Sequence, residues 1–398
     1  MNGPAVTGPF GLGTALAERE QADLLRRRIA THGSVAGRLQ VDGRDYLNFS
    51  ANDYLGLAEH GAIKAAFKEG IERYGTGSGA SPLVTGYSRA HQQLEETLAE
   101  WLGVEAVLLF NCGFSANQAV LRALLGKEHL LWQDKLNHAS LQEMGCQLPC
   151  KMKRFAHNDM AALERQLEPN RGLIVSEGVF SMDGDQAPWR ELATIAARSG
   201  NWLMIDDAHG LGVLGPEGRG TLAAQGVAPA SVHIQMGTFG KALGVAGAFV
   251  GGSRELVEYL VNFARHYVYS THMPAAQACA VSKSIELVRA ADEVRAHLGQ
   301  LIARFRQGTQ ALGWQLGASD TPIQPLLVGE SVAALQLAER LRERGVWVSA
   351  IRPPTVPVGT ARLRITLSAA HREQDLDRLL DALGVCPAAT TLGEAHHD

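Results

Sequence analysis

Short runs of apolar residues recur along the middle of the chain, separated by segments with helical periodicity. The runs are AVLLF (106–110), HLLW (129–132), GLIV (172–175), NWLMI (201–205), VHIQM (232–236) and AGAFV (246–250). Between most of them lie segments such as ANQAVLRALL and PWRELATIAARS, in which apolar residues return every three or four positions. Apolar strands that alternate with helices are typical of a largely parallel sheet covered on both faces. We therefore expect a large α/β domain at 60–288.

The two ends of the chain have different patterns. Residues 1–59 predict an arm, a helix at about 15–30 and a hairpin over 35–48 with its turn at Asp42-Gly43. Residues 289–386 contain helical and alternating segments, among them the strands VWVSAI and ARLRITLS, which predict a smaller α/β domain. The polar tail at 387–398 is predicted to be disordered.

Composition excludes several classes of protein. The 398 residues carry 37 basic and 41 acidic side chains, a net charge of −4, which gives no general attraction to nucleic acid or anionic membranes. No apolar run approaches the roughly 18 residues of a membrane-spanning helix, and no secretory signal is visible. The five cysteines form no CxxC pair, as is typical of reduced cytosolic thiols. We expect a cytoplasmic protein.

Reactive side chains follow several of the predicted strands, at the edge of a parallel sheet where ligands bind. Lys241 lies in the glycine-flanked segment TFGKALG, where a partly desolvated amine could form an imine, although a solvated surface lysine is the ordinary alternative. Asp206 ends an apolar run and could pair with a protonated ring nitrogen or cap a turn. His209 could donate to a phenolate, bind a metal or serve only the turn. Each residue alone leaves these alternatives open.

A second group of residues suits a flat, phosphorylated ligand. Gly113 and Phe114 open a predicted helix whose first amides could hold a phosphate, and Ser181 and Thr238 could add hydroxyl donors. An ordinary glycine turn is the alternative for the first pair. His138 could stack on an aromatic ring, although a lone histidine is more often structural.

The combination of these residues fits pyridoxal phosphate. That cofactor needs a lysine for its aldehyde, a carboxylate that keeps its ring nitrogen protonated, and a phosphate site. A zinc hydrolase built on His209 and Asp206 would need a closely spaced ligand set such as HExxH, and none is present. A Rossmann oxidoreductase would need GxGxxG after its first strand, which GTGSGA (75–80) does not provide. A non-catalytic binding module would not explain Lys241 and Asp206 together.

Longer motifs resemble the α-oxoamine synthases, a branch of the fold-type I pyridoxal-phosphate enzymes. They are NDYLGL (52–57), GSGAS (77–81), TGYSRAHQQLEE (85–96), GFSANQAV (113–120), EGVFSMDGD (177–185), DDAHG (206–210), TFGKALG (238–244) and YSTHMP (269–274). The resemblance covers roughly residues 20–385 in motif order. It implies a large domain with a mostly parallel seven-stranded sheet, a smaller α/β C-terminal domain and an N-terminal segment.

The resemblance also implies roles for individual residues. Lys241 would bind the cofactor aldehyde and later act as the base at the amino-acid Cα. Asp206 would pair with the pyridinium, and His209 would hydrogen-bond the phenolate oxygen. His138 would stack on the cofactor ring. Further residues would surround the cofactor: Gly113, Phe114, Ser181 and Thr238. Thr271 would reach the cofactor phosphate from the neighbouring chain. The amino-acid carboxylate would be held by Asn52 and Arg352, and the acyl side would be lined by Arg26 and Thr355. Shared sites imply a homodimer.

Within this family, FAHND (155–159), QPLLVG (324–329) and AIRPPTVPVGTARLRITLSAAH (350–371) are similar to the branch that condenses L-alanine with a pimeloyl thioester in biotin biosynthesis. The acyl group would arrive on coenzyme A or on an acyl carrier protein. The alternative is a member that uses glycine or serine with another acyl-CoA. Two positions, Leu211 and Cys112, depart from the residues usual in the family, and neither carries the chemistry.

Overall fold

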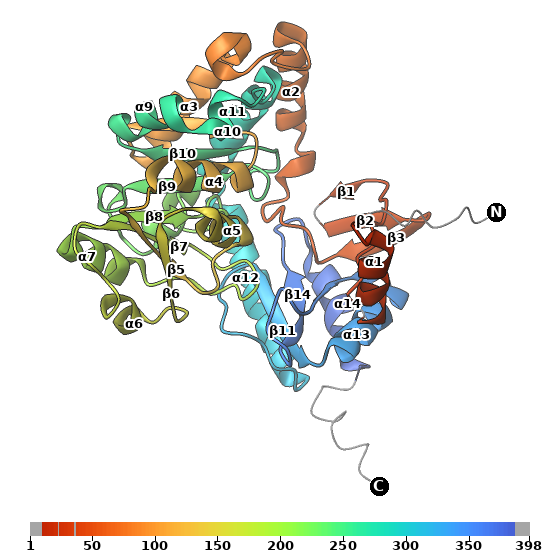
Figure 1. Ribbon diagram of the computed structural model, residues 1–398. Coiled ribbons are helices and arrows are strands. Elements are labelled where there is room, and N and C mark those ends of the chain that lie inside the picture. The colour runs from red at the N-terminus through yellow and green to blue at the C-terminus, as the bar shows by residue number, and fades with distance from the viewer. Residues whose placement is uncertain (1–9, 23, 36, 387–398) are drawn as a thin grey trace.

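The computed structural model describes residues 10–22, 24–35 and 37–386. Its largest sheet has seven strands in the order β4-β10-β9-β8-β7-β5-β6 (Figure 1). They are β4 (Ala106–Phe110), β5 (Leu130–Asp134), β6 (Lys151–Phe155), β7 (Gly172–Glu177), β8 (Trp202–Asp206), β9 (Ile234–Thr238) and β10 (Ala248–Gly252). Strand β10 runs antiparallel to both of its neighbours, and the other pairs are parallel. The predicted mostly parallel seven-stranded sheet is confirmed.

Helices cover both faces of this sheet, because successive strand side chains alternate between the faces. One face packs on α4 (Gly113–Leu124), α5 (Ala139–Gln147) and α9 (Arg254–Phe263). The other packs on α3 (Arg89–Leu102) and α11 (Ala275–Arg289) at one side and on α6 (Met160–Glu164) and α7 (Trp189–Ser199) at the other. The remaining helices here are α2 (Gly61–Tyr74), α8 (Thr221–Ala224) and α10 (Arg265–Val268).

Two smaller sheets lie beside the large one. The first, in the order β1-β2-β3-β12, joins β1 (Ser34–Val35), β2 (Gly37–Val41) and β3 (Arg44–Asn48) to β12 (Val346–Trp347). The second, β11-β14-β13, joins β11 (Ile323–Gly329), β13 (Ser349–Ile351) and β14 (Ala361–Thr366). Three helices accompany them: α12 (Asp292–Ala311), α13 (Ser331–Glu343) and α14 (Glu373–Gly384). The domain limits at 59/60, 288/289 and 386/387 stay predictions, and the tail predicted at 387–398 lies outside the described residues.

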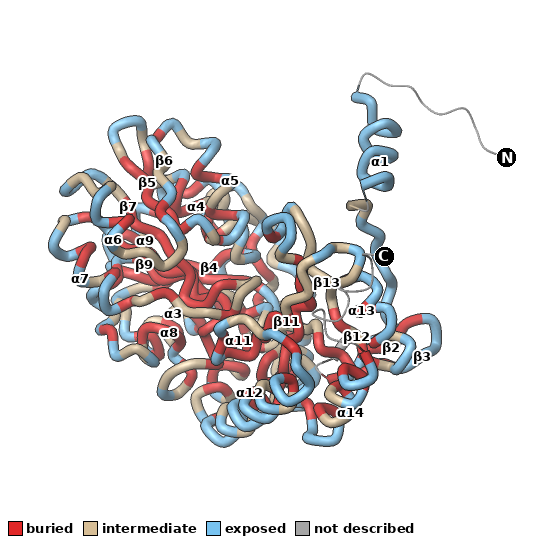
Figure 2. The backbone as a smooth tube through the Cα atoms, turned by 90° about the horizontal axis from the view of Figure 1, so that it is seen from below, coloured by how far each residue is buried: buried red, intermediate tan, exposed pale blue. Residues whose placement is uncertain are grey.

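The N-terminal segment differs in part from its prediction. The hairpin is confirmed, and Asp42 and Gly43 have φ of 48° and 76°, as a two-residue turn of this kind requires. The helix predicted at about 15–30 is wrong in its second half, because α1 (Leu12–Gln21) ends before Ala22. None of its residues is buried, and it projects from the body (Figure 2). A helix without packed neighbours gains little from extension.

Two other elements differ from the expectation. Strand β6 was not among the predicted runs, because its sequence KMKRF buries only Phe155 at the edge of the sheet. The predicted strand VWVSAI is two strands in different sheets, since β12 pairs with β3 and β13 pairs with β14. In the described residues no helix is long and apolar enough to cross a membrane.

Candidate active site

Three side chains that end neighbouring strands point to the same face of the large sheet. Val175 and Met204 belong to the core under α4 and α5, so Glu177 and Asp206, two residues further along, share their face. Glu177 is also the register partner of Asp206. Met236 places Thr238 on this face in the same way. The strand alternation therefore builds a polar floor at the carboxyl ends of β7, β8 and β9.

The Lys241 amine begins a chain of polar contacts across this floor. Its Nζ lies 2.7 Å from His209 Nε2, and His209 Nδ1 lies 2.6 Å from the Tyr54 hydroxyl. Tyr54 donates to Asn52 Oδ1 at 3.3 Å, and the same oxygen accepts from Arg364 Nη1 at 3.1 Å. The predicted residues Lys241, His209 and Asn52 thus lie in one network, which joins the large sheet to β14.

Asp206 is held from two sides. Its Oδ2 accepts from Asn117 Nδ2 at 2.7 Å, and its Oδ1 accepts from the Ala208 N–H at 3.1 Å. Asn117 also donates to Ser140 Oγ at 2.9 Å, and that hydroxyl lies 2.8 Å from His138 Nδ1. Helices α4 and α5 therefore fix the carboxylate and the imidazole ring relative to each other.

Burial controls the charges of this site. It lowers the pKa of Lys241 to about 8, although the negative charges of Asp206 and Glu177 raise it. Burial also raises the pKa of Glu177 well above its ordinary value, with the Asp206 charge adding to the effect. A lysine amine with a lowered pKa next to a buried carboxylate is a reactive nucleophile and base near neutral pH.

Burial disfavours the charged form of both imidazoles of the site. Burial lowers the pKa of His209 well below its ordinary value, and the Lys241 charge lowers it further. Burial likewise lowers the pKa of His138, against the Asp206 charge, which raises it. A neutral ring can donate through one nitrogen and accept through the other, as a proton-bearing contact with a phenolate oxygen requires.

Helix α4 offers an anion site beside this floor. Cys112 precedes its first turn, and no side chain of the described residues caps that turn. A Cβ on Gly113 would lie 3.9 Å from the Thr238 Cβ, so the two positions border one space. The ring of Phe114 lies edge-on to His138, with centroids 6.4 Å apart.

The remaining predicted residues lie further out. Ser181 reaches the network through its carbonyl oxygen, which accepts from Arg364 Nε at 2.6 Å. A separate pocket of about 560 Å³ lies between the segment after α1 and the loop before β14, and it is lined by Arg26, Arg352 and Thr355. Thr271 is exposed, and its carbonyl accepts from Asn111 Nδ2 at 2.9 Å. The structure gives the positions of these residues, and their roles stay predictions.

Sequence reasoning missed four side chains of the network: Tyr54, Asn117, Glu177 and Arg364. All four lie within motifs that were recognised as similar to the family. Arg364 gave no clear signal in the sequence, because an arginine that alternates with leucine and isoleucine is typical of a half-exposed strand. In the structure all six residues of its strand β14 are buried. A buried arginine needs polar partners, so its position indicates a site.

The residues present fit pyridoxal phosphate. Glu177 Oε1 and Asn117 Oδ1 are buried without a hydrogen-bond partner in the described structure, next to the Lys241 amine and the Asp206 carboxylate. Unpaired buried polar atoms beside reactive groups indicate a polar ligand. The amine suits an aldehyde, the carboxylate a protonated ring nitrogen, and the α4 turn a phosphate.

Comparison with known proteins decides the family. The chain matches the family aminotransferase class I and II over residues 44–383. It is 88% identical to the 8-amino-7-oxononanoate synthase of Aeromonas salmonicida over 397 residues, covering both chains completely. The chain belongs to the 8-amino-7-oxononanoate synthases. The resemblance to the α-oxoamine synthases is thereby confirmed.

Solved structures agree with the membership of this synthase family. A structure of SPT with PLP has a TM-score of 0.88 at 27% identity and covers 96% of this chain and 98% of its own. The Francisella tularensis 8-amino-7-oxononanoate synthase has a TM-score of 0.76 at 28% identity and covers 85% and 97%. The chain is a pyridoxal-phosphate enzyme of fold type I, as the sequence predicted.

The two departures from the family pattern lie beside the site. Leu211 is buried in the core under α3 and α11, and Cys112 precedes α4 with its Sγ 3.5 Å from Ser115 Oγ. Neither side chain contacts the Lys241 network in the interactions of the described residues.

Proposed function

We propose that this enzyme condenses L-alanine with a pimeloyl thioester, with loss of CO2, to give 8-amino-7-oxononanoate and the free thiol carrier in biotin biosynthesis. The observation that carries the proposal is the buried Lys241 amine, with its lowered pKa, in contact with His209 and in the field of Asp206. This arrangement occurs in a chain that aligns over its whole length with the synthases of that name.

Each residue of the network has a defined task in this reaction. When bound, pyridoxal phosphate supplies a ring that withdraws electrons from the amino-acid Cα. Lys241 would bind the aldehyde carbon and, once its amine is free, would take the proton from Cα. Asp206 would keep the ring nitrogen protonated, and His209 would donate to the ring oxygen. His138 would pack on the ring face.

The substrate carboxylate has two candidate partners. The family resemblance favours Arg352, together with Asn52. Arg352 lines the separate pocket of about 560 Å³, with Arg26 and Thr355 on the acyl side. Arg364 is the residue that the contacts favour, since it shares Asn52 with the Tyr54 hydroxyl. Either guanidinium can hold a carboxylate through two parallel hydrogen bonds.

We also propose that two copies form a homodimer, in which Thr271 of one copy reaches the phosphate site of the other. Support comes from exposed apolar side chains near this segment: Tyr269 is 70% exposed, Val84 72% and Leu83 53%. Large exposed apolar groups of this kind mark surfaces that a partner covers. Gly113, Phe114, Ser181 and Thr238 would complete the cofactor site within one copy.

The carrier and the compartment are proposals as well. The acyl group arrives on coenzyme A or on an acyl carrier protein, and both present a thioester to the same pocket. All five cysteines are free thiols, which supports the reducing cytoplasm as the place of work.

A product assay tests the proposed reaction. Purified enzyme with pyridoxal phosphate is incubated with pimeloyl-CoA and, separately, with alanine, glycine or serine, and the product mass and CO2 are measured. Alanine is expected to give a product of the mass of 8-amino-7-oxononanoate, and Lys241→Ala is the inactive control. Faster product formation with glycine or serine would place the enzyme in another branch of the α-oxoamine synthases.

A further inference from the structure

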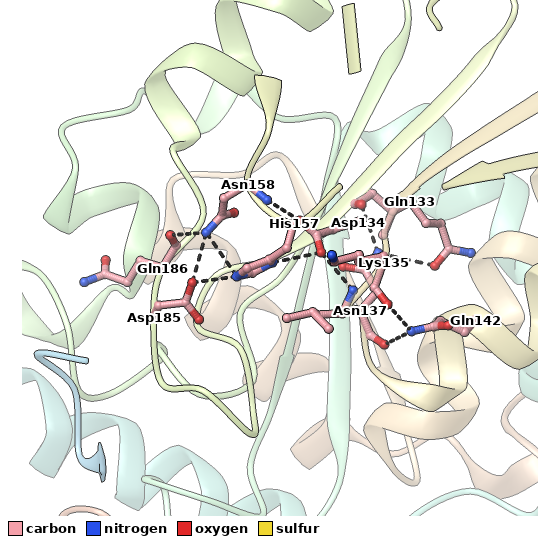
Figure 3. A network of polar contacts seen from close by, with 11 residues as sticks. Gln133, Asp134, Lys135, Asn137, Gln142, His157, Asn158, Asp185 and Gln186 are labelled. Carbon is pink, nitrogen blue, oxygen red and sulfur yellow. Dashed lines mark hydrogen bonds and ion pairs between the residues drawn. The ribbon is translucent and has the colours of Figure 1, made fainter. Parts of the chain in front are cut away.

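His157 lies between two carboxylates beyond the ends of β5 and β6 (Figure 3). Its Nδ1 is 3.0 Å from Asp134 Oδ1, and its Nε2 is 2.7 Å from Asp185 Oδ2. Phe180 packs edge-on against the ring, with centroids 4.4 Å apart. Burial alone would lower the pKa of His157, but the two hydrogen-bonded carboxylates raise it to about 10. The ring is therefore a cation that donates from both nitrogens.

The residues around His157 strengthen this contact. The Asn158 N–H donates to Asp134 Oδ2 at 2.8 Å, and the Asn158 side chain donates to Asp185 Oδ2 at 3.0 Å and to the Gln186 carbonyl at 3.1 Å. Asn158 has a φ of +53°, a left-handed conformation that asparagine tolerates better than most residues. The loop 181–186 is thus fastened to the ends of β5 and β6.

The other side of the loop 181–186 faces the small sheet. The Ser181 carbonyl accepts from Arg364 Nε at 2.6 Å. The Gly184 carbonyl accepts from the hydroxyls of Ser319 and Thr321, at 3.0 and 2.9 Å, ahead of β11. The loop is therefore the link through which the large sheet sets the position of Arg364.

We propose that His157 is a positioning residue for the amino-acid substrate, acting through Asp185 and the Ser181 carbonyl on the Arg364 guanidinium. Arg364 Nη1 donates to Asn52 Oδ1 and to Thr366 Oγ1, at 3.1 Å each, and its Nε donates to the Ser181 carbonyl, so the loop fixes the Nε edge of the guanidinium. A displacement of about 1 Å in a binding group costs up to about 100-fold. Asp206 ends β8 and Lys241 follows β9, and in the hydrogen bonds of the described residues neither side chain contacts the loop 181–186. This inference rests on the proposed function.

The test uses the holoenzyme with two variants that cut the same contact, His157→Gln and Asp185→Asn. We measure alanine affinity from the cofactor absorbance, kcat, cofactor affinity and the thermal midpoint. Each variant is expected to bind alanine about tenfold more weakly, with cofactor affinity within about twofold of wild type. The double variant is expected to be no weaker than the weaker single variant, because both changes remove one contact.

His233→Gln is the matched control. This imidazole lies before β9, at the opposite ends of the strands, where it accepts from the Leu203 N–H at 3.1 Å and stacks on Trp202. Its loss is expected to leave alanine affinity unchanged. If His157→Gln does not fold, Asp185→Asn, which keeps a polar side chain of the same size, carries the test.

Two results would overturn the inference. One is a lower thermal midpoint in both variants with unchanged alanine affinity, since a purely structural contact predicts that pattern. The other is an equal loss of alanine affinity in His233→Gln. If the wild-type enzyme prefers glycine or serine, the proposed function fails. The inference about His157 is then tested separately, by comparing the affinities of the variants and the wild type for that amino acid.

Discussion

Replacing Asp206 by asparagine removes one charge from the centre of the site and changes its volume little. In the wild type the two carboxylate oxygens accept from different donors, Asn117 Nδ2 and the Ala208 N–H. Asparagine has one acceptor oxygen, so one of these donors loses its partner. An unsatisfied buried donor costs about 1–3 kcal/mol of folding free energy.

The effect on turnover is expected to be larger than the effect on stability. A preorganised charge in a buried site contributes about 3–4 kcal/mol to the transition state, which corresponds to a loss of about 100- to 1000-fold. In the proposed role, removal of the Asp206 charge would take away the group that keeps the cofactor ring nitrogen protonated. The Lys241 pKa also falls further, because the Asp206 charge is the first of the effects that raise it.

Asp207→Asn is the control for this experiment. Asp207 is a buried carboxylate at the next position, but it binds the Thr221 N–H at 2.7 Å and the Thr221 hydroxyl at 2.6 Å. The hydroxyl can rotate and accept from an amide, so this variant keeps its contacts with Thr221. Rates of CO2 release are compared at saturating cofactor. Turnover of Asp206→Asn within about tenfold of wild type would refute the assigned role.

Three further predictions follow from the charges and contacts of the site. Because the pKa of Lys241 is lowered to about 8, the rate of cofactor binding to the apoenzyme is expected to rise with pH and to level off above about 8, where the amine is neutral. The rate is followed by absorbance, and a plateau only above pH 10 would contradict this. Arg364→Ala and Arg352→Ala are each expected to weaken binding of the substrate that the arginine contacts by about 2–4 kcal/mol. Alanine titration of both variants shows which arginine holds the alanine carboxylate. Unchanged alanine affinity in both variants would exclude both arginines from that role. Burial raises the pKa of Asp207 to about 7, so wild-type stability falls as pH rises from about 4 to 7 while that of Asp207→Asn does not; parallel unfolding curves over that range would show that the group is not shifted.

The sequence pointed to Lys241 and Asp206 because strand ends carry a readable signal. An apolar run that stops at Asp206 and a lysine between glycines at 241 indicate a candidate carboxylate and a candidate amine without any tertiary information. The hairpin turn at Asp42-Gly43 is equally local, because its backbone conformation depends on those two residues. Such features are fixed by short-range physical chemistry.

Other features depend on neighbours that a single sequence does not reveal. In the sequence, Arg364 looks like a residue on the exposed face of an edge strand. In the structure β14 is the central strand of its sheet, and all six of its residues are buried. Strand β6 has charged residues because it lies at an edge, and α1 ends early because none of its residues is buried in the described structure. In each case the tertiary surroundings overrode the local pattern.

The parallel pairing of β3 with β12 has a consequence for synthesis of the chain. Val346 pairs with Leu47, so the N-terminal hairpin cannot complete its sheet until about 300 more residues have been made. At about 5–20 residues per second, this delay lasts roughly 15–60 s on the ribosome. The edge of β3 stays open during that time and is exposed to mispairing with other nascent chains. Asn52, which follows β3, reaches its place beside Arg364 only when β14 has emerged.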